Sequence, residues 1–246
     1  MTWPPGVVSS PVALAARRWP ELEDHRPVLL VPLGSCEQHG PHLPLGTDTL
    51  VALAVAERVA AIAPDERAVA PPVAYGASGE HAGFPGTLSI GTDALTALLV
   101  ELVRSADHFD GVVLVNGHGG NRDAVTAAMA RVHVEGQGAL AWWPGVPGGD
   151  AHAGRTETSL VLALAPGDVV VDRISPGRTE PLDELWPALR ASGVAAVSPN
   201  GVLGDPRGAS AAEGERLLAE LVRSCSEAIA GWQRGRRPPA ARAPRG

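Results

Sequence analysis

The sequence has no lysine, so all 20 of its basic side chains are arginine. Aspartate and glutamate together number 27, and the formal net charge is -7. Proteins that bind nucleic acid usually carry an excess of positive charge, because they neutralise a phosphate backbone. The acidic balance of this chain therefore argues against nucleic acid as its main partner.

Cysteine is scarce as well. The chain has only Cys36 and Cys225, and they form no CxxC pair. This predicts a reduced protein without a structural disulfide. Residues 1–10 lack the charged and apolar regions of a signal peptide, and no uninterrupted apolar run reaches the about eighteen residues of a membrane span. We therefore expect a cytoplasmic protein without a membrane partner.

Several common active-site signatures are missing. There is no GxSxG elbow, which disfavours a serine hydrolase. Cys36 directly precedes Glu37, and a neighbouring carboxylate disfavours the reactive thiolate. The glycine-rich stretch "VNGHGGN" (115–121) matches neither GxxxxGK[ST] nor GxGxxG. A phosphate- or nucleotide-binding module built on this stretch nevertheless stays open as an alternative at this point.

The 246 residues, of which 45% are apolar and 19% charged, suit one substantial core. Apolar runs of strand length alternate with helical patterns. Strands are expected at 27–33, 68–75, 111–117 and 138–143, and helices at 48–63, 92–109, 121–136, 156–166 and 211–232. This order predicts an α/β fold with a mostly parallel sheet covered on both faces. We expect one domain over 1–232 and a disordered, arginine- and proline-rich tail over 233–246.

Polar residues gather where the expected strands end. They form four clusters, at 32–48, 76–87, 115–121 and 148–159. Ligands bind beyond the carboxyl ends of parallel strands, so these clusters are expected to meet at one site. Five of the eight histidines lie in them: His39, His42, His81, His118 and His152. This concentration favours a metal site.

The first cluster carries the clearest pattern. Glu37 and His39 are two residues apart, so in extended chain their side chains project to the same face. A carboxylate and an imidazole together suit zinc, iron or manganese. Asp48 follows after a short loop, where it either joins the same site or only caps the helix that begins there. Trp142 and Trp143 precede the loop of His152, and they either wall a substrate pocket or close the core.

Four motifs together resemble the creatininase family of metal-dependent amidohydrolases. They are E-x-H-G-x-H-L-P-x-x-T-D (37–48), GEHAGFPGT (79–87), NGHGGN (116–121) and HAGRTETS (152–159). The resemblance runs from about residue 27 to residue 165 and implies a three-layer α/β/α sandwich with two divalent metal ions per chain, zinc, iron(II) or manganese. It also implies roles for single residues: Glu37 and His39 each bind one metal, Asp48 bridges the two, His118 is a further ligand and His152 is the catalytic histidine.

One position departs from creatinine amidohydrolase itself. That enzyme has a glutamate ligand two residues after the histidine of this motif, where the present chain has Gly120. The resemblance to relatives with the same NGHGGN motif implies that Glu157 supplies the ligand instead. Glycine is also expected to leave room beside the metals, which disfavours creatinine and favours an extended peptide.

A narrower resemblance covers the stretches YGASGEH (75–81), TLSIGT (87–92), PGGDAHAGRTETS (147–159) and 193–214. They are similar to members of the family that act as peptidases on a short ribosomally made precursor peptide and release a Val-Tyr-derived dipeptide from its C-terminus. This implies a peptidase that forms homo-oligomers. Substrate contacts are expected from five residues: His42, Ser78, His81, Gly119 and Trp143. Another amidohydrolase of the family, acting on creatinine or deformylating a heterocycle, is the alternative.

Overall fold

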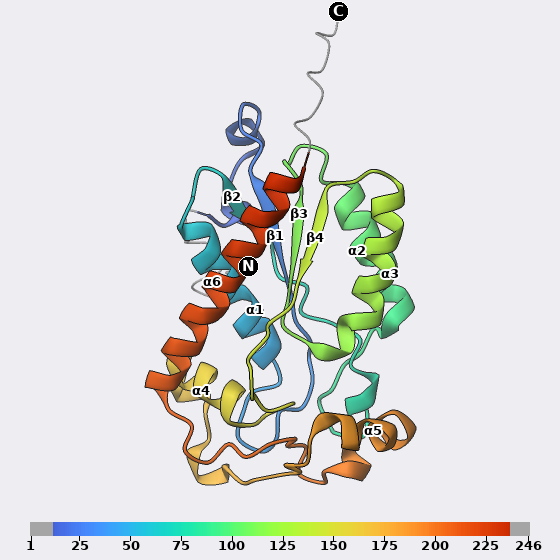
Figure 1. The fold of residues 1–246 in the computed structure, drawn as a ribbon, viewed down its shortest axis with the longest axis vertical. Coiled ribbons are helices and arrows are strands. Elements are labelled where there is room, and N and C mark those ends of the chain that lie inside the picture. The colour runs from blue at the N-terminus through green and yellow to red at the C-terminus, as the bar shows by residue number, and fades with distance from the viewer. Residues whose placement is uncertain (1–11, 237–246) are drawn as a thin grey trace, which may run out of the picture.

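A four-stranded parallel sheet forms the centre of the molecule in the computed structural model, which describes residues 12–236 (Figure 1). Its strands are β1 (Val28–Leu33), β2 (Arg67–Val69), β3 (Val112–Asn116) and β4 (Ala139–Trp142), in the order β2-β1-β3-β4. Every pair is parallel, with Leu29 opposite Val112 and Val112 opposite Ala139. The predicted α/β fold with a parallel sheet is confirmed.

The helices alternate with the strands along the chain. They are α1 (Thr47–Ala61), α2 (Gly91–Arg104), α3 (Arg122–Val134), α4 (Arg155–Leu164), α5 (Leu182–Val197) and α6 (Ala211–Gly235). Short 3-10 turns lie between them: η1 (Leu14–Ala16), η2 (Trp19–Leu22), η3 (Gly79–His81), η4 (Gly119–Asn121), η5 (Pro166–Asp168) and η6 (Val171–Arg173). Among the described residues, no helix is both long and apolar enough to cross a membrane.

Alternation along the strands divides the core into two layers. Leu30 and Val113 pack with apolar residues of α1, α4 and α6 on one face of the sheet. Leu29 and Leu114 pack with α2 and α3 on the other. Figure 1 shows these helices on opposite sides of the strands. Every residue of β1 and β3 is buried, and apart from Asn116 at the end of β3 all are apolar, which is typical of a parallel sheet between two helical layers.

The C-terminal third differs from the expectation. Helix α5 was not expected, because it contains Pro187 and is kinked at Gly193, where φ is 73°. It packs against η3 through Leu185, Leu189 and the neighbouring Phe84. The strand expected over 68–75 ends at Val69, before two prolines. The predicted tail began at 233, but α6 continues to Gly235, and residues 237–246 lie outside the described residues.

Candidate metal centre

The polar clusters at the strand ends meet in one place. Side chains from the loops after β1, β3 and β4, from η3, and from the first turns of α1 and α4 gather at the carboxyl edge of the sheet. Seven acids and imidazoles take part: Glu37, His39, Asp48, His81, His118, His152 and Glu157. Glu37 and His39 have no exposed surface. Such a concentration of buried ionisable groups is expensive unless it serves a ligand or a reaction.

Asp48 stands at the middle of this cluster. Its Oδ1 lies 3.0 Å from Nε2 of His39, and its Oδ2 lies 3.1 Å from Nδ1 of His118. Oδ2 also accepts a hydrogen bond of 2.6 Å from the hydroxyl of Ser35. The N-cap of α1 is Gly46, and no side chain caps this helix. The alternative that Asp48 only caps a helix is therefore wrong, since its two oxygens face two different histidines.

Glu37 presents a buried carboxylate that faces three imidazoles. Its Oε2 lies 3.1 Å from Nε2 of His118, and its Oε1 lies 3.4 Å from Nε2 of His81 and 3.7 Å from Nδ1 of His152. Both oxygens are buried and accept no hydrogen bond. Leaving a buried carboxylate without a donor costs several kcal/mol, of order 3–5, unless a cation neutralises it. The orphaned carboxylate among imidazoles therefore fits a zinc-, iron- or manganese-type ion.

Glu157 lies beside His39 in the cluster. It lies in the first turn of α4, and its Oε2 is 3.8 Å from Nε2 of His39. The same oxygen accepts a 2.5 Å hydrogen bond from the backbone N–H of Ala153. Ala153 has a φ of 50°, an unfavourable left-handed conformation for a residue with a Cβ. The strain is typical of a backbone held in place for a functional site, here between His152 and Glu157.

Three overlapping sets of side chains bring their ligand atoms within 4.8 Å of one another: Glu37, His39 and Asp48; His39, His152 and Glu157; Glu37, His81 and His152. The two sets that contain His39 each hold two or more of the ligands predicted from the sequence. His152 belongs to two of the three sets, so its position suits either proton transfer or ligation. Its assignment to proton transfer stays a prediction.

The electrostatics of the histidines differ sharply. Burial lowers the pKa of His39, but the charge of Asp48, its hydrogen bond and the charges of Glu157 and Glu37 together outweigh burial and raise the pKa to about 10. Burial also lowers the pKa of His152, and repulsion from His39 and His81 takes it well below its usual range. The negative charge of the site therefore favours the protonated form of His39, whereas His152 stays neutral and keeps one lone pair free.

The residues expected to touch substrate are spread over several environments. Ser78 is buried, with its Oγ 3.4 Å from Nε2 of His118. His42 is buried and lies 2.9 Å from the hydroxyl of Thr158. Gly119 is exposed beside the cluster.

The two tryptophans before the loop of His152 pack against the core rather than the polar cluster. Trp142 is buried in the core layer of α1 and α6. Trp143 lies under the guanidinium of Arg122, at 5.5 Å, and lines a groove of about 420 Å³ bounded by residues of α3, β4 and α6. Its assignment to substrate binding stays a prediction without a contact in its favour.

The space beside Gly120 is not empty, contrary to expectation. A Cβ on Gly120 would lie 2.2 Å from Oε1 of Glu80 and 2.4 Å from Nε2 of His118. Glu80 fills this space, with Oε1 3.4 Å from the same nitrogen of His118. Sequence reasoning assigned Glu80 no role, although it directly precedes His81 in a motif that was singled out. Room for a peptide therefore has to be sought elsewhere at the site.

The two asparagines of the NGHGGN motif connect three loops. Asn121 donates to the carbonyl of Gly34 over 3.0 Å and accepts from the N–H of Ala77 over 2.9 Å. Asn116 donates to the carbonyl of His118 over 2.6 Å. These side chains fix the loops after β1 and β3 against the segment that leads into η3. The side chains of this stretch hold the loops of the cluster together, which argues against the alternative of a phosphate-binding turn.

Gln38 is a second residue that sequence reasoning missed. It lies between Glu37 and His39 and is buried, with its amide nitrogen 2.9 Å from Nδ1 of His81 and 3.0 Å from Nε2 of His152. Its contacts are 43 and 114 residues away along the chain. The signal that was available is its place inside the densest polar motif.

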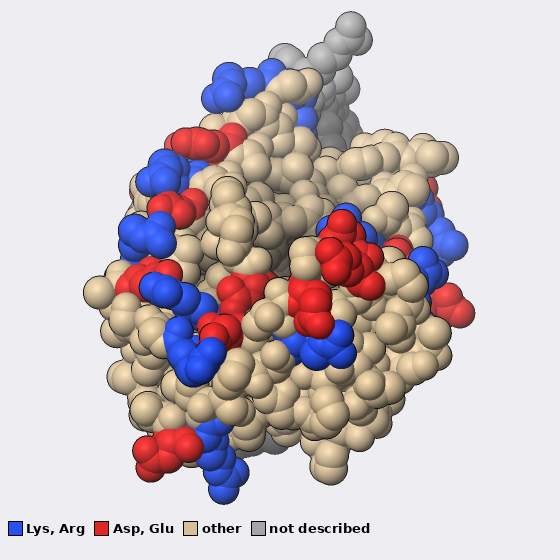
Figure 2. All heavy atoms as spheres, turned by 60° about the horizontal axis from the view of Figure 1, so that its bottom comes forward, with Lys and Arg blue, Asp and Glu red and all other residues tan. Residues whose placement is uncertain are grey.

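The surface over this end of the molecule has no dominant charge. Figure 2, which turns the loops at the bottom of Figure 1 toward the viewer, shows arginines and carboxylates interspersed among a larger uncharged area. A surface of this kind does not have the basic stripe that nucleic acid requires.

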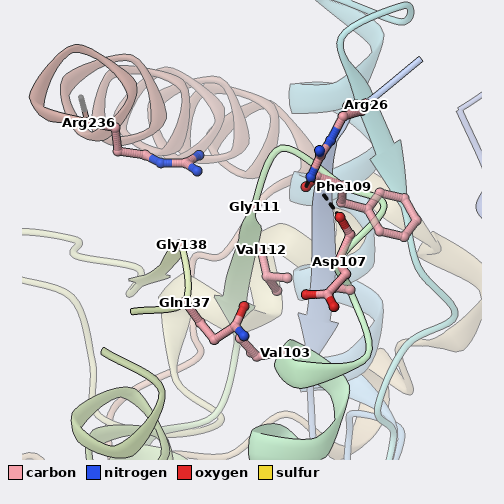
Figure 3. Close-up of a pocket in the computed structure, with 10 residues that line it drawn as sticks. Arg26, Val103, Asp107, Phe109, Gly111, Val112, Gln137, Gly138 and Arg236 are labelled. Carbon is pink, nitrogen blue, oxygen red and sulfur yellow. Dashed lines mark hydrogen bonds between the residues drawn. The ribbon is translucent and has the colours of Figure 1, made fainter. Parts of the chain in front are cut away.

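A second, smaller cavity lies at the opposite, amino ends of the strands. It has a volume of about 140 Å³ and is lined by Arg26, Asp107, Gln137 and Arg236 among others (Figure 3). Arg26 donates to the carbonyls of Asp107 and Phe109, over 2.7 and 3.1 Å. Its guanidinium is thus used to tie the chain before β1 to the turn before β3. The cavity and the histidine cluster therefore lie at opposite ends of the strands.

Comparison with known proteins agrees with the motifs. Residues 15–229 match the model of the creatininase family, described as creatinine amidohydrolase. The chain is 54% identical over 232 residues to the mycofactocin precursor peptide peptidase of Mycolicibacterium smegmatis, covering 92% of this chain and 94% of the relative. It is 31% identical over 238 residues to the creatinine amidohydrolase of Pseudomonas putida, covering 82% and 88%. A solved creatininase variant of the Zn-Zn type matches with a TM-score of 0.73 at 28% identity, covering 89% of this chain and 97% of that one.

Proposed function

The chain belongs to the creatininase family, and we propose that it is a metal-dependent peptidase that cleaves the mycofactocin precursor peptide near its C-terminus. The similarity to a peptidase of that name over more than nine tenths of both chains supports this substrate. The product is a Val-Tyr-derived dipeptide. The enzyme is expected to work in the cytoplasm as a homo-oligomer, without a nucleic-acid or membrane partner.

The observation that carries the proposal is that the two carboxylate oxygens of Asp48 face two different histidines. One oxygen faces His39, with Glu157 beyond it, and the other faces His118, with Glu37 beyond it. The residues therefore form two half-sites that share one carboxylate. Each half-site offers an imidazole, a carboxylate and one oxygen of Asp48, which is a donor set for zinc, iron(II) or manganese. Bound divalent ions polarise an amide carbonyl and acidify water.

His152 supplies the proton transfer. Its Nε2 donates to the backbone carbonyl of Gln38 over 2.8 Å, so Nδ1 is the free nitrogen and lies 3.7 Å from Oε1 of Glu37. Hydrolysis of a peptide bond consumes one water, forms a C–O bond, breaks the C–N bond and requires a proton on the departing nitrogen. A neutral imidazole with a free Nδ1 takes the proton from water and gives it to that nitrogen. The lowered pKa of His152 keeps it in the neutral form that this role needs.

Similarity favours a peptide as substrate, and the difference at residue 120 disfavours creatinine. Creatinine amidohydrolase itself is also a relative, but at 31% identity against 54%. Gly120 replaces a glutamate of that enzyme, and the corresponding carboxylate is supplied by Glu157, on the segment that also carries His152. The two enzymes therefore differ at the metal centre as well as in overall similarity.

The decisive experiment offers both substrates to the same enzyme. Zinc-, iron(II)- or manganese-loaded protein is incubated separately with the modified precursor peptide and with creatinine, and products are identified by mass spectrometry. The proposal requires a truncated peptide and a free dipeptide, with little or no creatinine turnover. Rapid conversion of creatinine while the peptide stays intact would reject the peptidase assignment and leave the metal centre standing. Protein that purifies without transition metal and gains none on loading would reject the metal centre as well.

A further inference from the structure

The side chain of Gln38 lies between the two histidines that face Oε1 of Glu37. We propose that Gln38 is a positioning residue that fixes which ring nitrogen of His81 carries the proton, while its backbone carbonyl does the same for His152. A chain of hydrogen bonds supports this role, because its donors and acceptors can be assigned from backbone groups of known polarity.

The amide orientation of Gln38 follows from two backbone partners. Its Oε1 lies 2.8 Å from the N–H of Gly40, which can only donate. Its Nε2 lies 3.0 Å from the carbonyl of Gly201, which can only accept. Exchanging the oxygen and the nitrogen would break both bonds at once, so the orientation is determined.

The position of the proton on His152 follows from the backbone carbonyl of Gln38. Nε2 of His152 lies 2.8 Å from the carbonyl oxygen of Gln38, so this nitrogen carries the proton. Nδ1 is then unprotonated and faces Oε1 of Glu37. The side-chain amide nitrogen of Gln38 lies 3.0 Å from Nε2 of His152 as well, but two donors do not bond each other. The second amide proton of Gln38 is therefore available for another acceptor.

That acceptor is His81. Its Nδ1 lies 2.9 Å from Nε2 of Gln38 and accepts the remaining amide proton. The proton of His81 must then reside on its own Nε2, which lies 3.4 Å from Oε1 of Glu37. The rings of His81 and His152 lie 4.4 Å apart, between centroids. They thus present opposite functions to one carboxylate oxygen, since His81 offers a proton and His152 offers a lone pair.

The backbone around Gln38 is shaped for this amide. Gly201 has a φ of 78°, and a Cβ there would lie 1.8 Å from Oε1 of Gln38. Two residues further on, Leu203 forms paired backbone hydrogen bonds of 3.1 and 2.8 Å with His152. One short segment therefore holds both the amide of Gln38 and the histidine that it contacts. The expected effect of Gln38 on turnover rests on the proposed peptidase function. The assignment of the two tautomers does not depend on that function.

Nitrogen NMR tests the assignment directly. The zinc-loaded full chain, labelled with ¹⁵N-histidine, gives long-range ¹H–¹⁵N patterns that separate the two neutral tautomers. Signals are assigned with His81→Gln and His152→Gln. We expect both histidines of the unaltered protein to be protonated at Nε2. In Gln38→Glu, a carboxylate oxygen replaces the donor beside His81, so the proton of His81 should move to Nδ1 while that of His152 stays on Nε2.

Activity and a matched control complete the test. Gln38→Glu and Gln38→Ala should lower kcat by about 10–100-fold, the usual effect of losing an orienting partner at a metal site. Gln137→Glu, at the cavity of Figure 3, should leave both the spectrum and kcat unchanged. A proton on Nδ1 of His81 in the unaltered protein would overturn the proposal, even if no Gln38 variant folds. Unchanged His81 signals in both Gln38 variants would overturn it too, whereas failure to cleave the peptide would count only against the proposed function.

Discussion

Gly120 and Glu80 compete for one volume, because a Cβ at residue 120 would lie 2.2 Å from Oε1 of Glu80. The same Cβ would lie 2.4 Å from Nε2 of His118 and 2.5 Å from the carbonyl oxygen of Ala77. Glu80 is a flexible side chain and can move, but the carbonyl belongs to backbone held by Asn121. Any side chain at 120 therefore disturbs His118, one of the predicted ligands.

Gly120→Ala should weaken metal binding at the His118 half-site. We expect the affinity for the second metal equivalent to fall by about 10–100-fold, as it does when an orienting contact to a ligand is lost. Zinc titration followed by calorimetry measures this. Gly167→Ala is the control, since a Cβ there meets nothing within 4 Å. Two equivalents bound at unaltered affinity by Gly120→Ala would show that His118 is not a ligand in this position.

The parallel sheet was predictable because its two central strands are buried on both faces and therefore consist of unbroken apolar residues. The helices around it carry regular patterns. Helix α5 was not predictable from the same rules, since Pro187 and Gly193 normally end a helix. It exists because its apolar residues cover η3, a contact with a segment about a hundred residues earlier that no local pattern records.

The candidate site was predictable in its residue types more than in its arrangement. Glu37 and His39 could be grouped because their spacing suits one face, whereas Asp48 could be added only as an alternative to a helix cap. Glu80 and Gln38 were missed because their partners are distant along the chain. The expectation of empty space at Gly120 failed for the same reason, since the side chain that fills it comes from another loop.

Asp48→Ala should lose both metals. Asp48 is the proposed bridge, and its oxygens face His39 and His118 at 3.0 and 3.1 Å. Removing it takes one ligand from each half-site and leaves two imidazoles without their shared partner. Elemental analysis of the purified variant gives the result, with Asp93→Ala as a control in the exposed first turn of α2. Full metal content in Asp48→Ala would refute the bridging role.

His152→Ala should keep its metals and lose its rate. The predicted role is proton transfer, so kcat should fall by about 10²–10⁴ at full metal occupancy. His152 also lies close enough to Glu37 and to Glu157 to bind a metal with them. Steady-state kinetics and elemental analysis of the same preparation separate a role in proton transfer from a role as a metal ligand. His108→Ala, on the exposed surface, should match the unaltered protein in both measurements. Loss of one metal equivalent from His152→Ala would instead make His152 a ligand.

His42 should make the protein less stable in acid. Burial, together with repulsion from His39, lowers the pKa of His42 from 6.5 to about 4. Its Nε2 contacts Thr158, while its Nδ1 has no partner that would hold a proton. Between these two pH values the unfolded chain binds a proton at His42 that the folded chain does not bind. The contribution of neutral His42 is therefore fully present above about pH 6.5, and it is lost as the pH falls toward 4.

A substitution isolates this contribution from the other ionisable groups of the site. His42→Gln cannot titrate, and its amide still reaches the hydroxyl of Thr158. Urea midpoints of metal-free protein between pH 7 and 4.5 should therefore fall more steeply for the unaltered chain than for the variant. Using metal-free protein removes the separate effect of acid on metal release. Parallel pH profiles for the two proteins would mean that His42 accepts its proton in the folded state, and the buried environment of Nδ1 would then have to contain a partner for it.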